Sequence, residues 1–272
     1  MSNRHNIMKI TGNGYLEKII NHKKAEVSRV FAGLSTGDMR DVCLKSEPAR
    51  DFRSSLKRDD GVAVIAEFKR MSPSKGMINF DAQPEVTCRK FELGGADAIS
   101  VLTDEKFFGG QIGYIKRIKD SVKLPVLRKD FIIDERQIYE SKIKGADAVL
   151  FITRILTGKE LANFVKICRE IGIYALVEVH DEAEIEVSIE AGADIVGINN
   201  RNLDDFRVDL KVTERLINKV PYGVVKVSES GIKSRADVLW LRSLGVDAVL
   251  IGELLMKSDE VKVKIMELKL CL

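Results

Sequence analysis

The sequence lacks the residue patterns that build disulfide frameworks, zinc sites and membrane spans. Its 272 residues include four cysteines and three histidines, and no two cysteines form a CxxC pair. Widely scattered cysteines indicate neither a disulfide framework nor a zinc site, so reduced thiols in a cytoplasmic protein are the simpler interpretation. No apolar run reaches the roughly 18 residues of a membrane-spanning helix, and residues 1–13 lack the apolar core of a signal sequence.

The chain also lacks a strong excess of either charge. Its formal net charge is +3, which is too small to predict a nucleic-acid or membrane partner. A small positive excess suits an anionic substrate but discriminates poorly between functions. Apolar residues make up 45% and charged residues 31% of the chain, as in ordinary globular proteins. Nothing in the composition fixes the oligomeric state, and a monomer is the expectation.

What the sequence does contain is one short motif repeated four times. A glycine, a small residue and an aspartate precede an apolar run, at steps of about 50 residues. The copies occupy residues 95–102, 145–152, 192–199 and 245–252. The glycine suits the left-handed conformation that ends a helix, and the aspartate is expected to hydrogen-bond backbone in the tight turn that follows. The apolar run is typical of a strand buried on both faces.

A step of this length accommodates two strand–helix units, so a second strand should accompany each copy. Suitable runs lie at residues 61–68, 124–128, 173–178 and 223–228. Eight parallel strands alternating with helices predict a single (β/α)8 barrel, since an open doubly wound sheet gives no reason for such even repetition. We expect one domain over residues 1–272, in which 61–272 form the barrel and 1–58 form an N-terminal helical extension.

Helical periodicity is visible in the extension and between the predicted strands. An amphipathic helix is predicted over residues 15–32, with a looser segment at 34–46 and a short helix at 48–57. We expect most of this extension to cap one end of the barrel, with substrate binding as the alternative. The barrel helices are predicted at residues 81–93, 114–121, 135–144, 158–171, 182–191, 210–219, 234–244 and 258–269. The glycine- and phenylalanine-rich loop 103–113 is longer than a tight connection needs, which is typical of functional loops.

Polar residues follow several of the predicted strands, at the end of the barrel where active sites lie. They are Glu67 and Lys69 at the end of the first strand, Lys129 at the end of the third, Glu178 at the end of the fifth, Asn199 and Arg201 at the end of the sixth, and Glu229 at the end of the seventh. Converging charges change one another's pKa values, which is how sites prepare acids and bases. The alternative is a salt-bridge network that only fills the barrel mouth.

The turns after the last two strands carry a second signal. Ser230, Gly231, Gly252 and Glu253 lie where barrels often bind a phosphate through backbone N–H groups. Glu253 is acceptable there only if its carboxylate points away from the anion. Ordinary strand-to-helix turns are the alternative interpretation.

Together these segments resemble the indole-3-glycerol phosphate synthase family, the barrel enzymes of tryptophan biosynthesis. The resemblance is strongest over residues 65–74, which read Ile-Ala-Glu-Phe-Lys-Arg-Met-Ser-Pro-Ser. It continues through residues 102–110, 127–131, 177–180, 197–203 and 228–232, and the first helix at 16–27 is similar to that of the family. One departure is Gln111, where the family usually has serine after a Phe-Phe-x-Gly sequence.

The resemblance implies a carboxy-lyase reaction that needs neither a metal nor an organic cofactor. 1-(2-Carboxyphenylamino)-1-deoxyribulose 5-phosphate would close its ring to indole-3-glycerol phosphate, losing carbon dioxide and water. The resemblance makes Lys129 the general acid, a role that suits a lysine whose pKa is lowered by desolvation or neighbouring cations. Glu178 would act as acid or base in deprotonation and dehydration. Lys69 would hold the substrate carboxylate and could also donate a proton, and Glu67 would orient the lysines.

The same resemblance implies the residues that hold the substrate. Phe108, Phe131 and Leu150 would pack on the anthranilate ring. Asn199 and Glu229 would bind and position the reacting chain, and Ser72 and Arg201 would contact anionic or hydroxyl groups. Ser230, Gly231, Gly252 and Glu253 would bind the phosphate, largely through backbone. His180 and Asp130, which adjoin the proposed catalytic residues, are interpreted as structural.

Two other functions fit a barrel with a phosphate-binding turn. A phosphoribosyl-anthranilate isomerase would need a cysteine and an aspartate at strand ends, whereas the cysteines here fall in predicted helices or tails. A barrel that only binds a phosphorylated metabolite would not need both lysines and Glu178. The sequence therefore favours the synthase.

Overall fold

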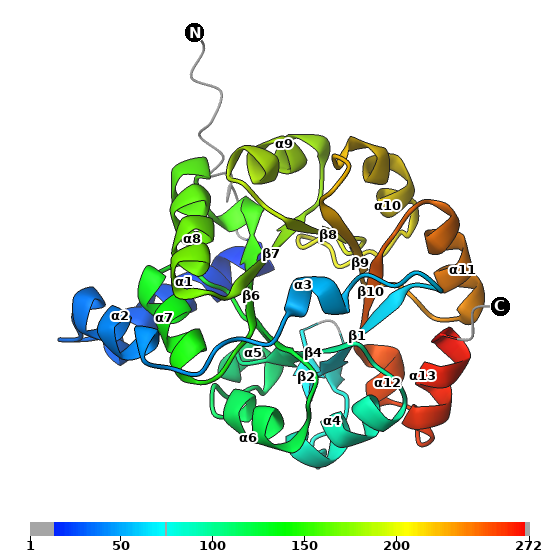
Figure 1. Cartoon of the computed structure of the whole chain (residues 1–272), viewed down its shortest axis with the longest axis horizontal. Coiled ribbons are helices and arrows are strands. Elements are labelled where there is room, and N and C mark those ends of the chain that lie inside the picture. The colour runs from blue at the N-terminus through cyan, green and yellow to red at the C-terminus, as the bar shows by residue number, and fades with distance from the viewer. Residues whose placement is uncertain (1–13, 74, 270–272) are drawn as a thin grey trace, which may run out of the picture.

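Eight parallel strands close into a barrel at the centre of the computed structural model (Figure 1). The structure describes residues 14–73 and 75–269, so Ser74 and Cys271 lie outside the described residues. The barrel strands are β1 (Ala63–Phe68), β4 (Ala98–Leu102), β5 (Val126–Lys129), β6 (Ala148–Ile152), β7 (Tyr174–Val179), β8 (Ile195–Asn199), β9 (Val225–Glu229) and β10 (Ala248–Ile251). Each strand pairs with its neighbours in chain order, and β10 closes the ring on β1. The predicted (β/α)8, or TIM, barrel is confirmed.

The outer helices lie within the segments predicted for them. They are α4 (Pro84–Leu93), α6 (Tyr114–Ser121), α7 (Glu135–Ile143), α8 (Gly158–Ile171), α9 (Glu182–Glu190), α10 (Lys211–Leu216) with a 3-10 turn η2 (Ile217–Lys219), α11 (Arg235–Ser243) and α13 (Val261–Lys269). Among the described residues no helix is both long enough and apolar enough to cross a membrane.

Several short elements were not predicted. They are α2 (Thr36–Leu44), where a looser segment was expected, the hairpin β2 (Met71–Ser72) and β3 (Gly76–Met77), α5 (Glu105–Phe108), η1 (Thr153–Ile155) and α12 (Glu253–Met256). Side-chain caps explain two of them, because Ser35 accepts hydrogen bonds at the start of α2 and Asp104 accepts one from the Phe107 N–H at 2.8 Å.

The four glycines of the repeated motif adopt the left-handed conformation, as predicted. Their φ angles are 88° at Gly95, 93° at Gly145, 85° at Gly192 and 89° at Gly245. The prediction for the aspartates was wrong, because three of them bond to the preceding strand rather than to their own turn. Asp97 accepts from the Val64 N–H, Asp147 from the Val126 N–H and Asp247 from the Lys226 N–H, at 2.7–2.8 Å. The repeat therefore joins neighbouring strands at the amino end of the barrel.

The N-terminal extension reaches both ends of the barrel. α3 (Phe52–Ser55) lies across the amino end, over the centre of the ring in Figure 1. Arg50 donates to backbone carbonyls just before β5, Arg53 donates to the Gly223 carbonyl before β9, and Asp51 accepts from the Tyr174 hydroxyl of β7. This part of the extension has the predicted capping role. The first helix, α1 (Tyr15–Val30), instead contributes residues to the cavity at the opposite, carboxyl end.

Candidate active site

A cavity of about 890 Å³ opens at the carboxyl end of the barrel. Every residue predicted for the site lines it: Glu67, Lys69, Ser72, Phe108, Lys129, Phe131, Leu150, Glu178, Asn199, Arg201, Glu229, Ser230, Gly231, Gly252 and Glu253. A volume of this size accommodates a small-molecule substrate.

Charged residues converge in this cavity, and we call Glu67, Lys69, Lys129, Glu178 and Glu229 the inner cluster. The Lys129 Nζ lies 2.7 Å from Glu229 Oε2 and 3.3 Å from Glu178 Oε2, and the Lys69 Nζ lies 2.6 Å from Glu67 Oε1. The three carboxylates are almost fully buried. Two cations thus face three carboxylates, as the sequence predicts, and the inner cluster is one cation short of balance.

Two glycines make room for the inner carboxylates. A methyl group added to Gly197 would collide with Glu229 Oε1, and one added to Gly252 would collide with Glu67 Oε1. Gly252 was predicted only as a phosphate-binding residue. Its lack of a side chain also allows Glu67 to lie close to the barrel wall.

Lys129 is more firmly protonated than the sequence suggested. Burial lowers its pKa, but the charges of Glu229, Glu178 and Glu67 raise the pKa by more, so it lies well above the ordinary lysine value. The expectation of a lowered pKa was wrong for this structure, because carboxylates and not cations surround the ammonium. Lys129 is held in the charged form that a general acid needs before it transfers a proton.

The carboxylates around Lys129 differ in their proton affinity. Burial raises the pKa of Glu229 to about 7, because the opposing attraction of Lys129 is offset by repulsion from Glu178 and Glu67. Burial also raises the pKa of Glu178, but Lys129, His180 and a 3.0 Å hydrogen bond from Asn199 outweigh it and leave that pKa below the ordinary value. Near neutral pH the site therefore holds an ionised Glu178 beside a Glu229 that is partly protonated.

A second buried cluster lies on the outer side of β5, and we call Lys23, Asp104, Arg128 and Asp130 the outer cluster. Side chains alternate across a strand, so Lys129 points into the barrel while Arg128 and Asp130 point away from it. The Lys23 Nζ of α1 lies 3.0 Å from both Asp104 Oδ2 and Asp130 Oδ1, and all three side chains are buried. The prediction of a structural Asp130 agrees with its place in this cluster.

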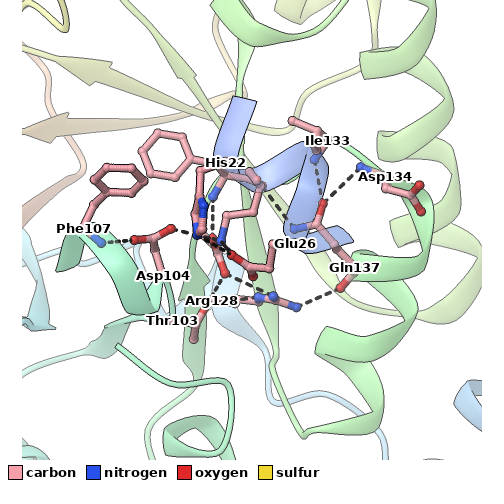
Figure 2. A network of polar contacts seen from close by, with 12 residues as sticks. His22, Glu26, Thr103, Asp104, Phe107, Arg128, Ile133, Asp134 and Gln137 are labelled. Atoms are coloured by element: carbon pink, nitrogen blue, oxygen red, sulfur yellow. Dashed lines mark hydrogen bonds and ion pairs between the residues drawn. The ribbon is translucent and has the colours of Figure 1, made fainter. Parts of the chain in front are cut away.

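Arg128 extends the outer cluster toward α7. Its guanidinium donates to Thr103 Oγ1 and to the Gln137 carbonyl, each at 3.1 Å (Figure 2). The Asp104 carboxylate accepts from the Phe107 N–H in the same view. The outer cluster thus connects α1 to the segment that carries Phe108 and to the end of β5.

One wall of the cavity is apolar. The rings of Phe108 and Phe131 have centroids 6.0 Å apart at an angle of 41°, and Leu150 lies on the same cavity. Sequence reasoning missed Tyr15, Leu16 and Ile19 of α1, which also line it. This helix was expected mostly to cap the barrel, with substrate binding as the alternative, and part of its apolar face forms the cavity wall.

The turn after β9 has the form expected of an anion-binding loop. Ser230 and Gly231 both have positive φ angles, 68° and 87°, and a side chain on Gly231 would collide with Val208. Asn200, a second residue that sequence reasoning missed, braces this turn by donating to the carbonyls of Glu229 and Ser230 at 2.9 and 3.1 Å. It follows Asn199 directly, and the two amides point to opposite sides of β8.

Basic residues surround the same end of the cavity. The Glu253 carboxylate accepts from Lys257 at 2.7 Å, which leaves its backbone N–H as the group able to face an anion. Lys75 and Lys233 also line the cavity, and within the described part of the chain neither has an ion-pair partner. Both were missed because single lysines in loops are ordinary surface residues.

The sequence of this chain is similar to that of known proteins over most of its length. The family model described as indole-3-glycerol phosphate synthase matches residues 16–268. An indole-3-glycerol phosphate synthase of Caldanaerobacter subterraneus subsp. tengcongensis is 50% identical over 92% of this chain and 96% of its own. One from Alkaliphilus metalliredigens is 44% identical over 93% of this chain and 97% of its own.

Solved structures at lower identity share the fold. A thiamine phosphate pyrophosphorylase from Pyrococcus furiosus is 17% identical, with a TM-score of 0.59 over 80% of this chain and 96% of that one. At that level of identity the likeness concerns the barrel alone.

Proposed function

The chain belongs to the indole-3-glycerol phosphate synthase family, and on that premise we propose how its cavity carries out the reaction. It is a carboxy-lyase of tryptophan biosynthesis that forms indole-3-glycerol phosphate. The substrate, 1-(2-carboxyphenylamino)-1-deoxyribulose 5-phosphate, loses carbon dioxide and water as its ring closes. The observation that carries the residue roles is the contact of Lys129 with Glu178 and Glu229 inside a cavity that has an aromatic wall.

The substrate's two anionic groups set its orientation. The anthranilate ring lies against Phe108, Phe131 and Leu150, and its carboxylate pairs with Lys69. The phosphate binds at the turns of Ser230, Gly231, Gly252 and Glu253. Arg201 and Ser72 contact anionic or hydroxyl groups, and Asn199 and Glu229 position the chain between ring and phosphate. Lys75 and Lys233 add positive charge at the phosphate end.

Ring closure uses Lys129 as the acid. The ring carbon that bears the carboxylate attacks the C2′ carbonyl, and Lys129 protonates the oxygen as negative charge develops on it. A carbonyl oxygen that enters beside Lys129 displaces a glutamate from it, and this lowers the lysine's pKa toward that of a useful acid. Loss of carbon dioxide then restores the aromatic ring.

Dehydration completes the indole. The new hydroxyl leaves as water once it is protonated, and a proton leaves the neighbouring carbon to form the ring double bond. Glu178, ionised and hydrogen-bonded by Asn199, serves as the base or acid of this step, and Lys69 is the second proton donor within the site. Glu67, 2.6 Å from Lys69, holds that lysine in place.

The wider assignments follow from this activity. We place the enzyme in the cytoplasm, with the phosphorylated substrate as its partner and no role for nucleic acid or membrane. The working unit is a monomer of one domain, with residues 61–272 as the barrel and 1–58 as its N-terminal extension. Neither a metal nor an organic cofactor enters any proposed step.

Turnover of the purified protein tests the proposal. In buffer containing a chelator, the protein should convert the carboxyphenylamino substrate into a product with indole fluorescence. Substrate binding without product would instead support a barrel that only binds a phosphorylated metabolite. Loss of activity that returns with added divalent metal would contradict a mechanism carried by side chains alone.

A further inference from the structure

His180 occupies a place directly behind the inner cluster. It follows the end of β7 and stands two residues after Glu178, so both side chains lie on the same side of the strand. Its side chain is 5% exposed and does not line the cavity. The ring is therefore placed to act on Glu178 rather than on a substrate.

Both nitrogens of the His180 ring face carboxylates. Nδ1 lies 3.1 Å from Glu184 Oε2 of α9, and Nε2 lies 3.3 Å from Glu178 Oε1. Within the described residues Nε2 has no hydrogen-bond partner of good geometry, although it is buried. A buried ring nitrogen that faces a carboxylate oxygen at this distance needs only a small rotation to complete a hydrogen bond.

The far side of the ring is held firmly. Glu184 Oε2 accepts from the His180 backbone N–H at 2.8 Å as well as facing its ring. The other oxygen of Glu184 accepts from Arg154 Nε at 3.0 Å. Glu184 is thereby fixed between Arg154 and His180, and it orients the imidazole toward Glu178 as second carboxylates orient catalytic histidines elsewhere.

We propose that His180 is a positioning residue that holds Glu178 in line for proton transfer and keeps it ionised between turnovers. This inference rests on the proposed role of Glu178 in dehydration. The groups that face the imidazole are Glu178 from β7, Glu184 from α9 and Arg154 from η1, and Lys129 acts on the same Glu178.

The electrostatics agree with this geometry. Burial lowers the pKa of His180, but the Glu184 hydrogen bond and the charges of Glu178 and Glu184 raise the pKa above its usual value. When the His180 ring is protonated, it adds a positive charge beside Glu178. Removing that charge raises the pKa of Glu178. The acidic limb of the plot of kcat against pH, where activity falls as Glu178 is protonated, therefore moves to higher pH.

Two substitutions of His180 distinguish its effect on the position of Glu178 from the effect of its charge. His180→Asn keeps a donor toward Glu184 but cannot reach Glu178, whereas His180→Gln reaches Glu178 with an uncharged donor. For His180→Asn we expect kcat to fall roughly tenfold to a hundredfold while KM stays within about twofold. The acidic limb of the kcat–pH profile of His180→Asn should move to higher pH by about one unit. His180→Gln should recover most of kcat at pH 8 but retain the shifted limb.

Three further variants serve as controls for the His180 substitutions. His22→Asn changes a partly exposed histidine of α1 outside the cavity and should leave the profile unchanged. If His180→Asn fails to fold, Glu184→Gln should still move the limb in the same direction. An unmoved limb in both His180→Gln and Glu184→Gln would overturn the inference. Glu178→Gln is the reference, because full activity of that variant would refute the role of Glu178 itself.

Discussion

β5 separates two buried charge clusters that differ in how completely their charges are paired. In the outer cluster every carboxylate oxygen of Asp104 and Asp130 lies within 3.1 Å of a cation or a donor. Among the described residues one oxygen in each cluster lacks a hydrogen-bond partner, Asp104 Oδ2 and Glu229 Oε1. Asp104 Oδ2 still lies 3.0 Å from the Lys23 ammonium, whereas in the inner cluster two lysines face three carboxylates. Lys129, the last residue of β5, and Asp130, the residue after it, thus belong to different clusters.

The difference shows how a site is distinguished from a structural network. The pKa of Asp130 is about 2, because Arg128 and Lys23 outweigh the burial that would raise it, so Asp130 stays ionised at any ordinary pH. The pKa of Glu229 is about 7, so the inner cluster can exchange a proton under working conditions. Incomplete pairing leaves room for a substrate to supply the missing contacts.

The largest expected effect is the loss of activity on removing Lys129. Lys129→Ala should lower kcat by about 10²–10⁴, because general acid catalysis contributes that much, and KM should change little. Steady-state assays of indole fluorescence measure this. If kcat of the variant stays within about threefold of the wild type, Lys129 is not the general acid and its role is structural.

Removing the central cation of the outer cluster should act on stability instead. Lys23→Met leaves Asp104 and Asp130 buried without it, which should cost about 3–5 kcal/mol in the free energy of unfolding. Denaturant unfolding measures the loss. At a temperature where the variant remains folded, kcat should stay close to that of the wild type.

Lys24 offers a matched control on the same helix. It is exposed, so Lys24→Met should change the unfolding free energy by less than about 0.5 kcal/mol. Equal stability of the two methionine variants would show that the outer cluster does not hold α1 in place.

A smaller effect concerns the pH dependence of stability. Because the pKa of Glu229 is raised from 4.5 to about 7 on folding, the folded state binds more protons than the unfolded state between those values. This group therefore lowers stability as pH rises through that window. Glu229→Gln should raise the unfolding temperature more at pH 8 than at pH 5. Glu267→Gln, at an exposed carboxylate of α13, should show no such difference, and an equal gain at both pH values would contradict the raised pKa.

The barrel and most of its site could be predicted because the signals are local. A motif with a regular period located all eight strands, and polar residues at their carboxyl ends identified Glu67, Lys129 and Glu178. Lys23 could not be recognised, because in sequence it is one lysine among several on an amphipathic helix. Its burial depends on Asp104 and Asp130, which are distant in the chain.

The two predictions that were wrong, like the missed Lys23, depend on contacts between residues distant in the chain. The pKa of Lys129 was expected to be lowered by desolvation or neighbouring cations, yet three glutamates surround Lys129 and raise its pKa. The repeated aspartates were assigned to their own turns, but three of them reach the preceding strand. Sequence spacing locates the end of a strand and not the partner that the fold brings to it.

The rate of carbon dioxide release in a single turnover tests the account most directly. Lys129 is proposed to act in ring closure, before carbon dioxide leaves, and Glu178 in the dehydration that follows. Lys129→Ala should therefore release carbon dioxide as slowly as it forms indole, whereas Glu178→Gln should release it faster than indole appears. Release at the wild-type rate from Lys129→Ala would contradict the assignment of Lys129 as the acid of ring closure.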